Sequence, residues 1–206
     1  PVLAVDADPN ACLDAALGVK ANNTVGRVRE DARMISSENP QIPKRELLEL
    51  KISESLVEGD DFDLIAMGRP EGPGCYCYAN NVLREVLKEI SNNYPYVIID
   101  NEAGLENLSR RIVRRVDMLL VVGEPSRNGI ETLKRIRALA EEMQIEYGKL
   151  IVVINRMFET HDAYAGLMKE IGADGIILLP HDDEIRRWNE EGRSFFSIPE
   201  NNAVYR

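Results

Sequence analysis

Short apolar runs alternate with longer amphipathic segments along the chain, and this alternation limits its possible folds more than any other feature. Six runs are continuously hydrophobic rather than alternating, as expected of strands covered on both faces. They are Val2–Val5, Phe62–Met67, Tyr96–Ile99, Met118–Val122, Leu150–Ile154 and Gly175–Leu179. Between them, helical spacing of apolar residues marks Ala79–Ser91, Leu105–Val116, Ile130–Met143, Asp162–Ile171 and Asp183–Glu191. The alternation predicts an α/β fold with an open, mostly parallel sheet and helices on both faces.

Composition narrows the class of protein. The 206 residues are 44% hydrophobic and 29% charged, which is typical of a single globular domain. With 25 Lys and Arg against 35 Asp and Glu, the net charge is −10. Such a charge repels phosphate backbones and anionic lipid, so we expect no nucleic acid and no membrane among its partners. No apolar run approaches the ~18 residues of a membrane span, no signal peptide is recognised, and three cysteines are too few for a disulfide framework. We therefore expect a cytoplasmic protein.

Polar residues follow several of the predicted strands. Ligands of open parallel sheets bind outside the carboxyl ends of the strands, so these residues are the first candidates for a site. They are Asp6 and Asp8 after the first run, Asp100 after the third, Asn155 after the fifth, and Pro180 and Asp182 after the sixth. An aspartate placed like Asp100 holds Mg²⁺ through water, and Asp8 is placed to orient or deprotonate an attacking water. Because Asp6, Asp8 and Asp182 are equally suited to start helices, the residues alone leave both roles open.

Cys75 and Cys77 flank one tyrosine in a segment rich in glycine and proline. In an extended stretch, side chains at i and i+2 point the same way, about 6.6 Å apart, and a modest turn brings both thiolates to one soft metal ion. A two-fold dimer would supply four sulfurs, a set that suits Zn²⁺, square-planar Ni²⁺ or a bridging iron–sulfur cluster. The alternative is that both are small buried apolar residues. A Gly/Pro-rich loop is a poor place to bury two thiols, which favours the metal.

A nucleotide site also needs donors that cradle the phosphates, usually on a loop of the form G-x-x-x-x-G-K-[ST]. These 206 residues contain no such motif, and their only Gly-Lys pair, Gly148-Lys149, leads into an apolar run and lacks the hydroxyl. The chain starts at Pro1 and enters a predicted strand at once. We therefore expect residues 1–206 to form a single P-loop NTPase-like domain that lacks its first strand, P-loop and first helix.

Three segments resemble a known family. Residues 2–10, Val-Leu-Ala-Val-Asp-Ala-Asp-Pro-Asn, look like the first switch of the deviant-Walker-A ATPases, which include bacterial partitioning ATPases and the nitrogenase iron protein. Residues 96–104, Tyr-Val-Ile-Ile-Asp-Asn-Glu-Ala-Gly, look like their second switch. Residues 68–77, Gly-Arg-Pro-Glu-Gly-Pro-Gly-Cys-Tyr-Cys, are similar to the metal-binding loop of the carbon monoxide dehydrogenase nickel-insertion ATPases. The Cys-x-Cys pair is the discriminating part of this resemblance.

The resemblance implies roles for individual residues. It implies that Asp8 positions the attacking water and that Asp100 lies on the magnesium side of the nucleotide, with Asp6 in the same site. It implies that the adenine is surrounded by Asn155, Pro180 and Asp182. It also implies that the second metal is bound by Cys75 and Cys77. It implies a homodimeric ATPase that binds ATP or ADP with Mg²⁺ and couples hydrolysis to nickel or zinc binding, with carbon monoxide dehydrogenase as client. Two alternatives stay open: a metal-binding dimerisation module without turnover, and an iron–sulfur electron-transfer ATPase.

Overall fold

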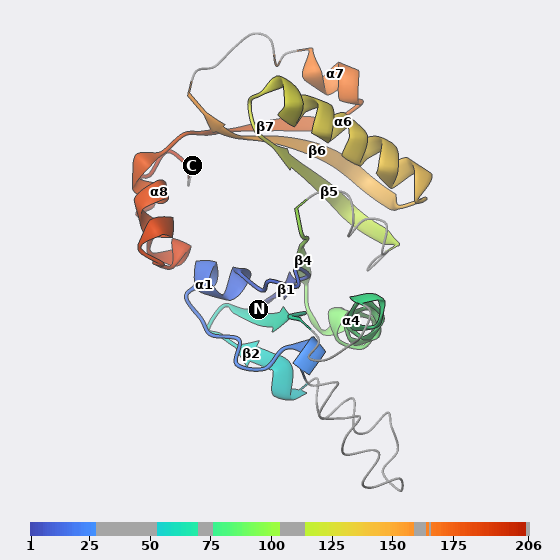
Figure 1. Ribbon diagram of the computed structural model, residues 1–206, viewed down its shortest axis with the longest axis vertical. Coiled ribbons are helices and arrows are strands. Elements are labelled where there is room, and N and C mark those ends of the chain that lie inside the picture. Colours follow the sequence, from blue (N-terminus) through green and yellow to red (C-terminus); the bar gives the residue numbers. More distant parts are fainter. Residues whose placement is uncertain (28–52, 70–75, 104–113, 159–163, 165, 205–206) are drawn as a thin grey trace, which may run out of the picture. The chain divides into compact units, whose positions relative to one another are not determined.

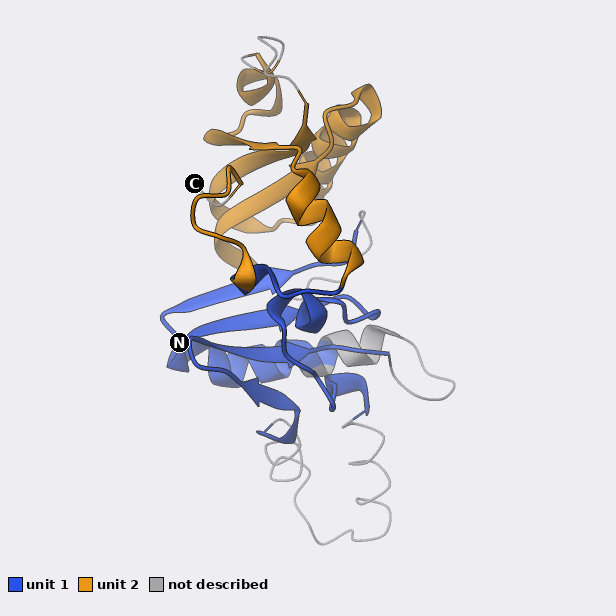
Figure 2. Ribbon diagram, turned by 90° about the vertical axis from the view of Figure 1, so that its left-hand side faces the viewer, with its two compact units in different colours: residues 1–103, 192–196 blue, residues 104–191, 197–206 orange. Residues whose placement is uncertain are grey.

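The computed structural model describes residues 1–27, 53–69, 76–103, 114–158, 164 and 166–204. The chain divides into two compact units, residues 1–103 with 192–196, and residues 104–191 with 197–206 (Figure 2). Each unit contains its own sheet, and the strands are mostly parallel. The predicted α/β fold class is confirmed. Within the described segments, no helix has both the length and the apolar character that crossing a membrane requires.

The first unit contains a four-stranded sheet in the order β2-β3-β1-β4. Strands β1 (Val2–Asp6), β3 (Phe62–Ala66) and β4 (Tyr96–Asp100) run parallel, as their apolar runs predict. Strand β2 (Leu56–Glu58) pairs antiparallel with β3 and was not predicted. The register aligns Asp6 with Asp100 on one side and with Ala66 on the other, so the last residues of three strands lie at one edge.

Helix α4 (Tyr76–Ile90) lies beside this sheet (Figures 1 and 2). Its buried residues Leu83, Val86 and Leu87 fall on one stripe, which is why the periodicity predicted a helix here. The helix starts earlier than the predicted Ala79, so Cys77 lies in its first turn and not in an extended stretch. Successive residues of a helix are rotated by about 100°, so the extended-strand argument for two parallel thiols is wrong for Cys77. Cys75 lies outside the described residues.

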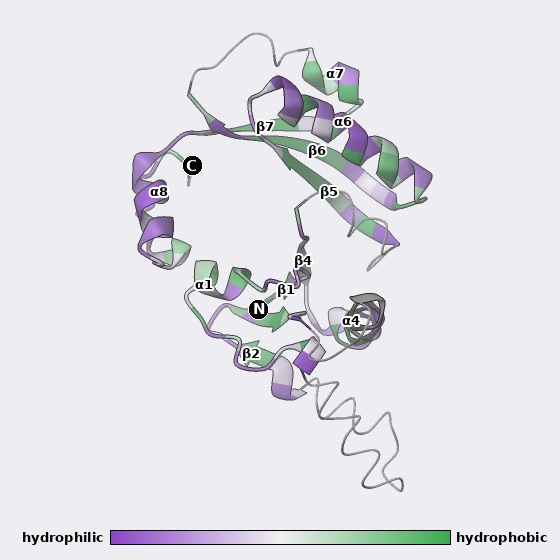
Figure 3. Cartoon of the chain, viewed as in Figure 1, coloured by the Kyte–Doolittle hydropathy of each residue, from purple (hydrophilic) through white to green (hydrophobic). Residues whose placement is uncertain are grey.

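The second unit contains a three-stranded parallel sheet in the order β5-β6-β7. Its strands are β5 (Arg115–Gly123), β6 (Glu146–Met157) and β7 (Gly175–Pro180). The predicted helix 105–116 is wrong at its end, because Val116 is a β5 residue that pairs with Tyr147 of β6. Most of that predicted helix lies outside the described residues. Strands of both sheets are predominantly apolar, whereas α8 (Asp183–Glu190) is largely polar (Figure 3).

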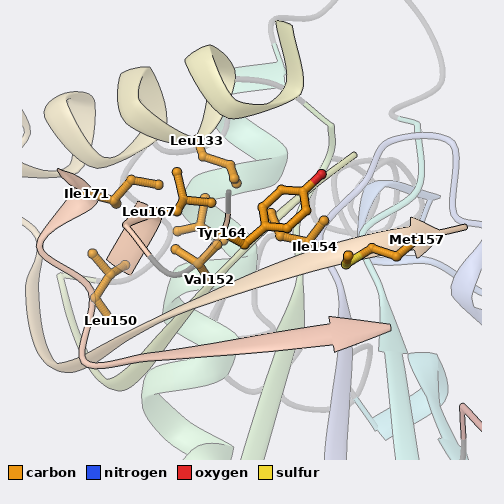
Figure 4. Close-up of a cluster of buried hydrophobic side chains, with 9 residues drawn as sticks. Leu133, Leu150, Val152, Ile154, Met157, Tyr164, Leu167 and Ile171 are labelled. Atoms are coloured by element: carbon orange, nitrogen blue, oxygen red, sulfur yellow. The ribbon is translucent and has the colours of Figure 1, made fainter. Parts of the chain in front are cut away.

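Helices α6 (Arg127–Glu142) and α7 (Leu167–Ile171) cover one face of this sheet (Figure 1). Helix α6 begins where the Ser126 hydroxyl accepts a hydrogen bond from Gly129 N–H at 3.0 Å. The core between helices and sheet is built from Val121, Leu133, Leu150, Val152, Ile154, Met157, Tyr164, Leu167 and Ile171 (Figure 4). Full burial of such a side chain contributes about 1.5–3 kcal/mol, so this cluster holds the carboxyl ends of β5 and β6 in place.

The remaining described elements are short. They are the helix α1 (Leu13–Leu17), the 3₁₀ helix η1 (Ser91–Asn93) and the 3₁₀ helix η3 (Phe195–Ser197). Helix α1 follows the loop after β1, so its start fixes where that loop ends.

Candidate functional site

Two aspartates occupy neighbouring positions at the carboxyl edge of the first unit's sheet. Asp6 ends β1 and is the register partner of Asp100, which ends β4. The pairing continues beyond the strands, because Ala7 N–H donates to the Asp100 carbonyl and Met67 N–H donates to the Asp6 carbonyl, each at 2.8 Å. Paired strands lie about 4.8 Å apart, so the structure brings together two of the carboxylates that the sequence places at strand ends.

Asp6 is buried, and its carboxylate organises the loop that follows β1. Its Oδ1 accepts a hydrogen bond from Asp8 N–H at 3.0 Å, and its Oδ2 accepts one from Leu13 N–H at 2.9 Å. Burial raises the pKa of Asp6, the two amide donors lower it, and the Asp8 charge raises it further. Leu13 is the first residue of α1, so Asp6 connects the end of β1 to the start of that helix.

Asp8 is half-buried, and only one of its carboxylate oxygens accepts hydrogen bonds from the described residues. Its Oδ1 accepts hydrogen bonds from Asn10 N–H at 2.7 Å and from Asn10 Nδ2 at 2.9 Å. Within the part of the chain that the structure describes, Oδ2 of Asp8 accepts no hydrogen bond. Asp8 does not cap α1, whose N-cap position is Cys12. The loop is strained at Ala11, whose φ of 50° lies in the left-handed region, and such strain is concentrated at functional sites.

Asp100 adds a third carboxylate to the same edge. Although the residue is exposed, the protein atoms around its carboxyl group displace water and raise its pKa. The negative charges of Asp6 and Asp8 raise this pKa further. No described group of three acidic, histidine or cysteine side chains converges into a metal cage.

A raised pKa in the folded state means that the ionised carboxylate opposes folding. This penalty is present at pH 7 and disappears as the pH falls through the raised pKa of Asp100. We expect Asp100→Asn to stabilise the protein at pH 7, with a gain that shrinks toward pH 4 as the wild-type carboxyl group takes up its proton. Urea unfolding at both pH values measures the difference. Equal or lower stability of the variant at pH 7 would contradict this electrostatic account.

Arg69 also lies at the carboxyl edge of the first unit's sheet, although the sequence did not predict it as a site residue. It follows β3, and its Nη2 donates a hydrogen bond to Oδ1 of Asn10, whose Nδ2 holds Asp8. The two residues are 59 positions apart, so only the fold reveals the contact. The preceding Gly68 gave a possible signal, because a glycine just past a strand end marks a special backbone position. Its φ is 62°, and a Cβ there would lie 2.3 Å from Oγ1 of Thr24.

The second unit has a carboxyl edge of its own, where Asn155 lies. Its Oδ1 accepts a hydrogen bond from Arg156 N–H at 2.9 Å. The pairing of β6 with β7 is irregular between Ile154 and Met157, and Arg156 has a φ of 59°. A bulge of this kind re-aims side chains and is common next to functional sites. The pairing resumes where Met157 meets Pro180, so Asn155 and Pro180 come to the same edge.

Asp182 acts as a helix cap. Its Oδ1 accepts a hydrogen bond from Ile185 N–H at 2.9 Å at the start of α8, and its Oδ2 accepts one from Asn202 Nδ2 at 3.1 Å. These donors, Ile185 N–H first, lower the pKa of Asp182. The capping alternative that the sequence left open is therefore the one that the structure shows, and a contact of Asp182 with adenine stays a prediction.

Comparisons with known proteins agree with this architecture. The family model described as "AAA domain" matches residues 1–152. An ATP-binding protein of Methanocaldococcus jannaschii is 42% identical over 213 residues, covering 100% of this chain and 83% of that protein. The carbon monoxide dehydrogenase accessory protein CooC of Rhodospirillum rubrum is 26% identical, covering 96% of this chain and 79% of that protein.

A solved structure shows the same fold. A ParA family ATPase from Chlorobium tepidum superposes with a TM-score of 0.71 at 17% identity, over 99% of this chain and 81% of that one. The family match includes the carboxyl edge of the first unit's sheet, and it ends within β6, before Asn155 and Pro180. The chain therefore belongs to the AAA domain family of P-loop NTPases.

Proposed function

We propose that this protein is a Mg²⁺-dependent ATPase whose reaction takes place at the edge formed by Asp6, Asp8 and Asp100. The observation that carries the proposal is Oδ2 of Asp8, which accepts no hydrogen bond from the described residues and belongs to a loop that Asp6 organises, where the charge of Asp8 acts on the Asp100 carboxyl group. In this position Asp8 orients a water molecule or accepts its proton, and Asn10 fixes the carboxylate that does so. The membership of the chain in a P-loop NTPase family supports the choice of a nucleoside triphosphate.

The donor set at this edge fits magnesium. Carboxylate oxygens are the ligands that Mg²⁺ prefers. Desolvation first and the charges of Asp6 and Asp8 second raise the pKa of Asp100, and a bound cation relieves the repulsion among these carboxylates. Asp100 would hold the ion through water, and Asp6 would support it indirectly, because its own oxygens are engaged by amides. When bound, the ion neutralises phosphate charge. The proposal includes a P-loop outside residues 1–206 that binds the phosphates and forms one domain together with these residues. Its test is ATP binding and hydrolysis by the full-length gene product, and a protein that does neither contradicts it.

Substitution of Arg69 tests whether the hydrogen bonds around Asp8 affect ATP turnover. We expect Arg69→Ala to lower kcat by about 10-fold, because a loosened Asn10 no longer fixes Asp8, and small losses of positioning have large effects on rate. KM for MgATP should stay within about twofold, since Arg69 contacts Asn10 and no phosphate in this proposal. Arg69→Lys should recover part of kcat. The control Lys20→Ala removes an exposed charge from the same unit and should change neither constant, whereas equal kinetics of Arg69→Ala and wild type would contradict the role.

The finer part of the proposal is metal delivery. The relative CooC is named as an accessory protein of carbon monoxide dehydrogenase, and Cys75 and Cys77 supply soft thiolate ligands. We therefore propose that the cargo is Ni²⁺ or Zn²⁺, that it lies between the cysteine pairs of two copies, and that carbon monoxide dehydrogenase is the client of this cytoplasmic homodimer. Asp8 and Asp100, by responding to the nucleotide, would change the affinity for the cargo.

Metal titration of the purified protein tests the proposal of metal delivery. The double variant Cys75→Ser, Cys77→Ser should lose both stoichiometric metal and metal-dependent dimerisation, measured by elemental analysis and light scattering. Cys12→Ser is the matched control, because Cys12 is an exposed free thiol at a distance from the pair in sequence. Metal binding without ATP turnover would favour the dimerisation module instead. A visible charge-transfer band would favour the iron–sulfur electron-transfer ATPase.

A further inference from the structure

A short segment from the C-terminal part of the chain packs on the first unit. Residues 192–196 belong to that unit, although the residues before and after them belong to the second (Figure 2). Two contacts hold this segment, which we call the strap. Ser194 lies against Gly18, and the ring of Phe196 stacks on that of Phe62, with the centroids 5.2 Å apart and the planes inclined by 18°. The strap therefore joins the end of α1 to the start of β3.

The contact with Gly18 leaves no room for a side chain at that position. Gly18 is the C-cap of α1 and has a φ of 73°, in the left-handed region that favours glycine. A Cβ there would lie 2.5 Å from Cβ and 2.7 Å from Oγ of Ser194, whereas Cα of Ser194 would be 3.7 Å away. The Ser194 side chain therefore sets how closely the strap approaches α1.

Helix α1 connects the strap to the loop that carries Asp8. Its first residue, Leu13, donates its N–H to Oδ2 of Asp6, and Oδ1 of Asp6 accepts a hydrogen bond from Asp8 N–H. The helix has five residues and is about 7.5 Å long, so a displacement at Gly18 reaches Leu13.

The loop between β1 and α1 is strained, which makes it sensitive to such a displacement. Ala11 has a φ of 50°, and strain of this kind persists only where the surrounding structure imposes it. Asp6 holds the loop on the β1 side, and the position of the helix holds it on the α1 side. A helix that is released at Gly18 lets Ala11 relax, and Asp8 then moves with the loop.

The strap itself is held by few contacts. None of residues 192–196 is buried, and Phe196 is 64% exposed, so its ring buries little apolar surface beyond the stack on Phe62. Segments held in this way open locally at a much lower cost than global unfolding. The strap can therefore leave and return while the sheet of the first unit stays folded.

We propose that the strap is a positioning element for the ATPase reaction. When the strap is docked, Ser194 fixes the end of α1, and α1 keeps the Asp8 carboxylate where it orients water. When the strap is released, the loop that carries Asp8 relaxes and turnover falls. This inference rests on the proposed ATPase function and adds the residues that keep the loop in its working conformation.

Compensating substitutions in the full-length gene product test the contact between Gly18 and Ser194. Gly18→Ala creates a clash and Ser194→Gly leaves a gap, so each should lower kcat by about 5-fold. KM for MgATP should stay within about twofold, since no phosphate contact is removed. The double variant should recover most of kcat, because the new Cβ then lies 3.7 Å from Cα of residue 194, in ordinary contact. The control Ser197→Ala, at an exposed position next to the strap, should change neither constant.

Hydrogen exchange tests the link from the strap to the loop without ATP. Phe196→Ala should make the amides of Leu13 and Asp8 exchange about 10-fold faster, because both lose their hydrogen bonds to Asp6 when the loop relaxes. The amides within β1 should exchange as in wild type. Phe196→Tyr keeps the stack on Phe62 and should also match wild type.

The outcomes separate this inference from the function on which it rests. If Gly18→Ala turns over like wild type, or no better than the double variant because backbone strain alone slows both, the strap has no positioning role and the ATPase proposal stands. Unchanged exchange at Leu13 and Asp8 in Phe196→Ala, or faster exchange throughout β1, would also overturn the inference. If Gly18→Ala does not fold, the exchange of Phe196→Ala decides. If wild type neither binds nor hydrolyses ATP, the proposed function fails, and the exchange still shows whether the strap holds the loop.

Discussion

Replacing Asp8 by asparagine is expected to lower ATP turnover of the full-length protein by at least about 100-fold, because a general base of this kind contributes about 10²–10⁴ to the rate. The asparagine keeps the size of the side chain and an oxygen for the Asn10 donors. It removes the negative charge and the basicity of Oδ2, the atom proposed to orient the water. ATP affinity should stay within about threefold, since the ground-state contacts are retained. Steady-state hydrolysis together with equilibrium ATP binding measures both effects.

The control for this variant is Asp14→Asn. Asp14 lies in α1, and its carboxylate accepts hydrogen bonds from the Ala15 and Ala21 backbone amides, so the substitution removes an equal charge nearby without touching the proposed water site. Turnover of Asp14→Asn should stay near that of wild type. Normal turnover of Asp8→Asn with normal ATP binding would remove Asp8 from the reaction.

Gly68→Ala is expected to destabilise the protein by about 2–4 kcal/mol. The φ of 62° costs an L-residue roughly 1–2 kcal/mol, and the new Cβ would lie 2.3 Å from Oγ1 and 2.4 Å from Cβ of Thr24, so the substitution also overpacks a buried position. Gly26 N–H donates to the Met67 carbonyl at 2.9 Å, so the two segments have little freedom to separate. Urea unfolding measures the loss.

A substitution at Gly192 separates the backbone cost of a positive φ from the steric cost of the Thr24 contact. It has nearly the same φ, 64°, but an added Cβ would meet nothing within 4 Å. Gly192→Ala should therefore show the backbone term alone, about 1–2 kcal/mol. Equal losses for the two variants would mean that the Thr24 contact does not constrain the loop that carries Arg69.

The strands could be predicted because strands of parallel sheets tend to be continuous apolar runs, and all six such runs form strands. The expectation that both faces of every strand are covered does not hold for β4, β5 and β7, which expose several of their residues. Strand β2 could not be predicted, because its three residues become a strand only through pairing with β3. The helix expected over 105–116 failed at its end for a related reason: pairing with β6 determines the conformation of Arg115 and Val116, whatever their helical spacing.

The residues of the candidate site that directly follow a strand could be predicted from the sequence, and the others could not. Asp6 and Asp100 could be placed because parallel strands end at one edge, and the register then aligns them. Arg69 and the bulge at Arg156 could not, since the first depends on a contact over 59 positions and the second on an irregular pairing. The role of Asp182 stayed open because capping and ligand binding use the same side chain, and only the Ile185 hydrogen bond reveals the cap.

The magnesium dependence of ATP affinity tests the central claim most directly, when wild type and Asp100→Asn are titrated with ATP in excess Mg²⁺ and in excess chelator. If the carboxylates of this edge hold the ion, Mg²⁺ should strengthen ATP binding by wild type at least about 10-fold. Mg²⁺ should strengthen ATP binding by Asp100→Asn far less, because the substitution removes the carboxylate that interacts with the ion. An identical gain from Mg²⁺ in the two proteins would show that Asp100 takes no part in holding the ion, and would contradict the account.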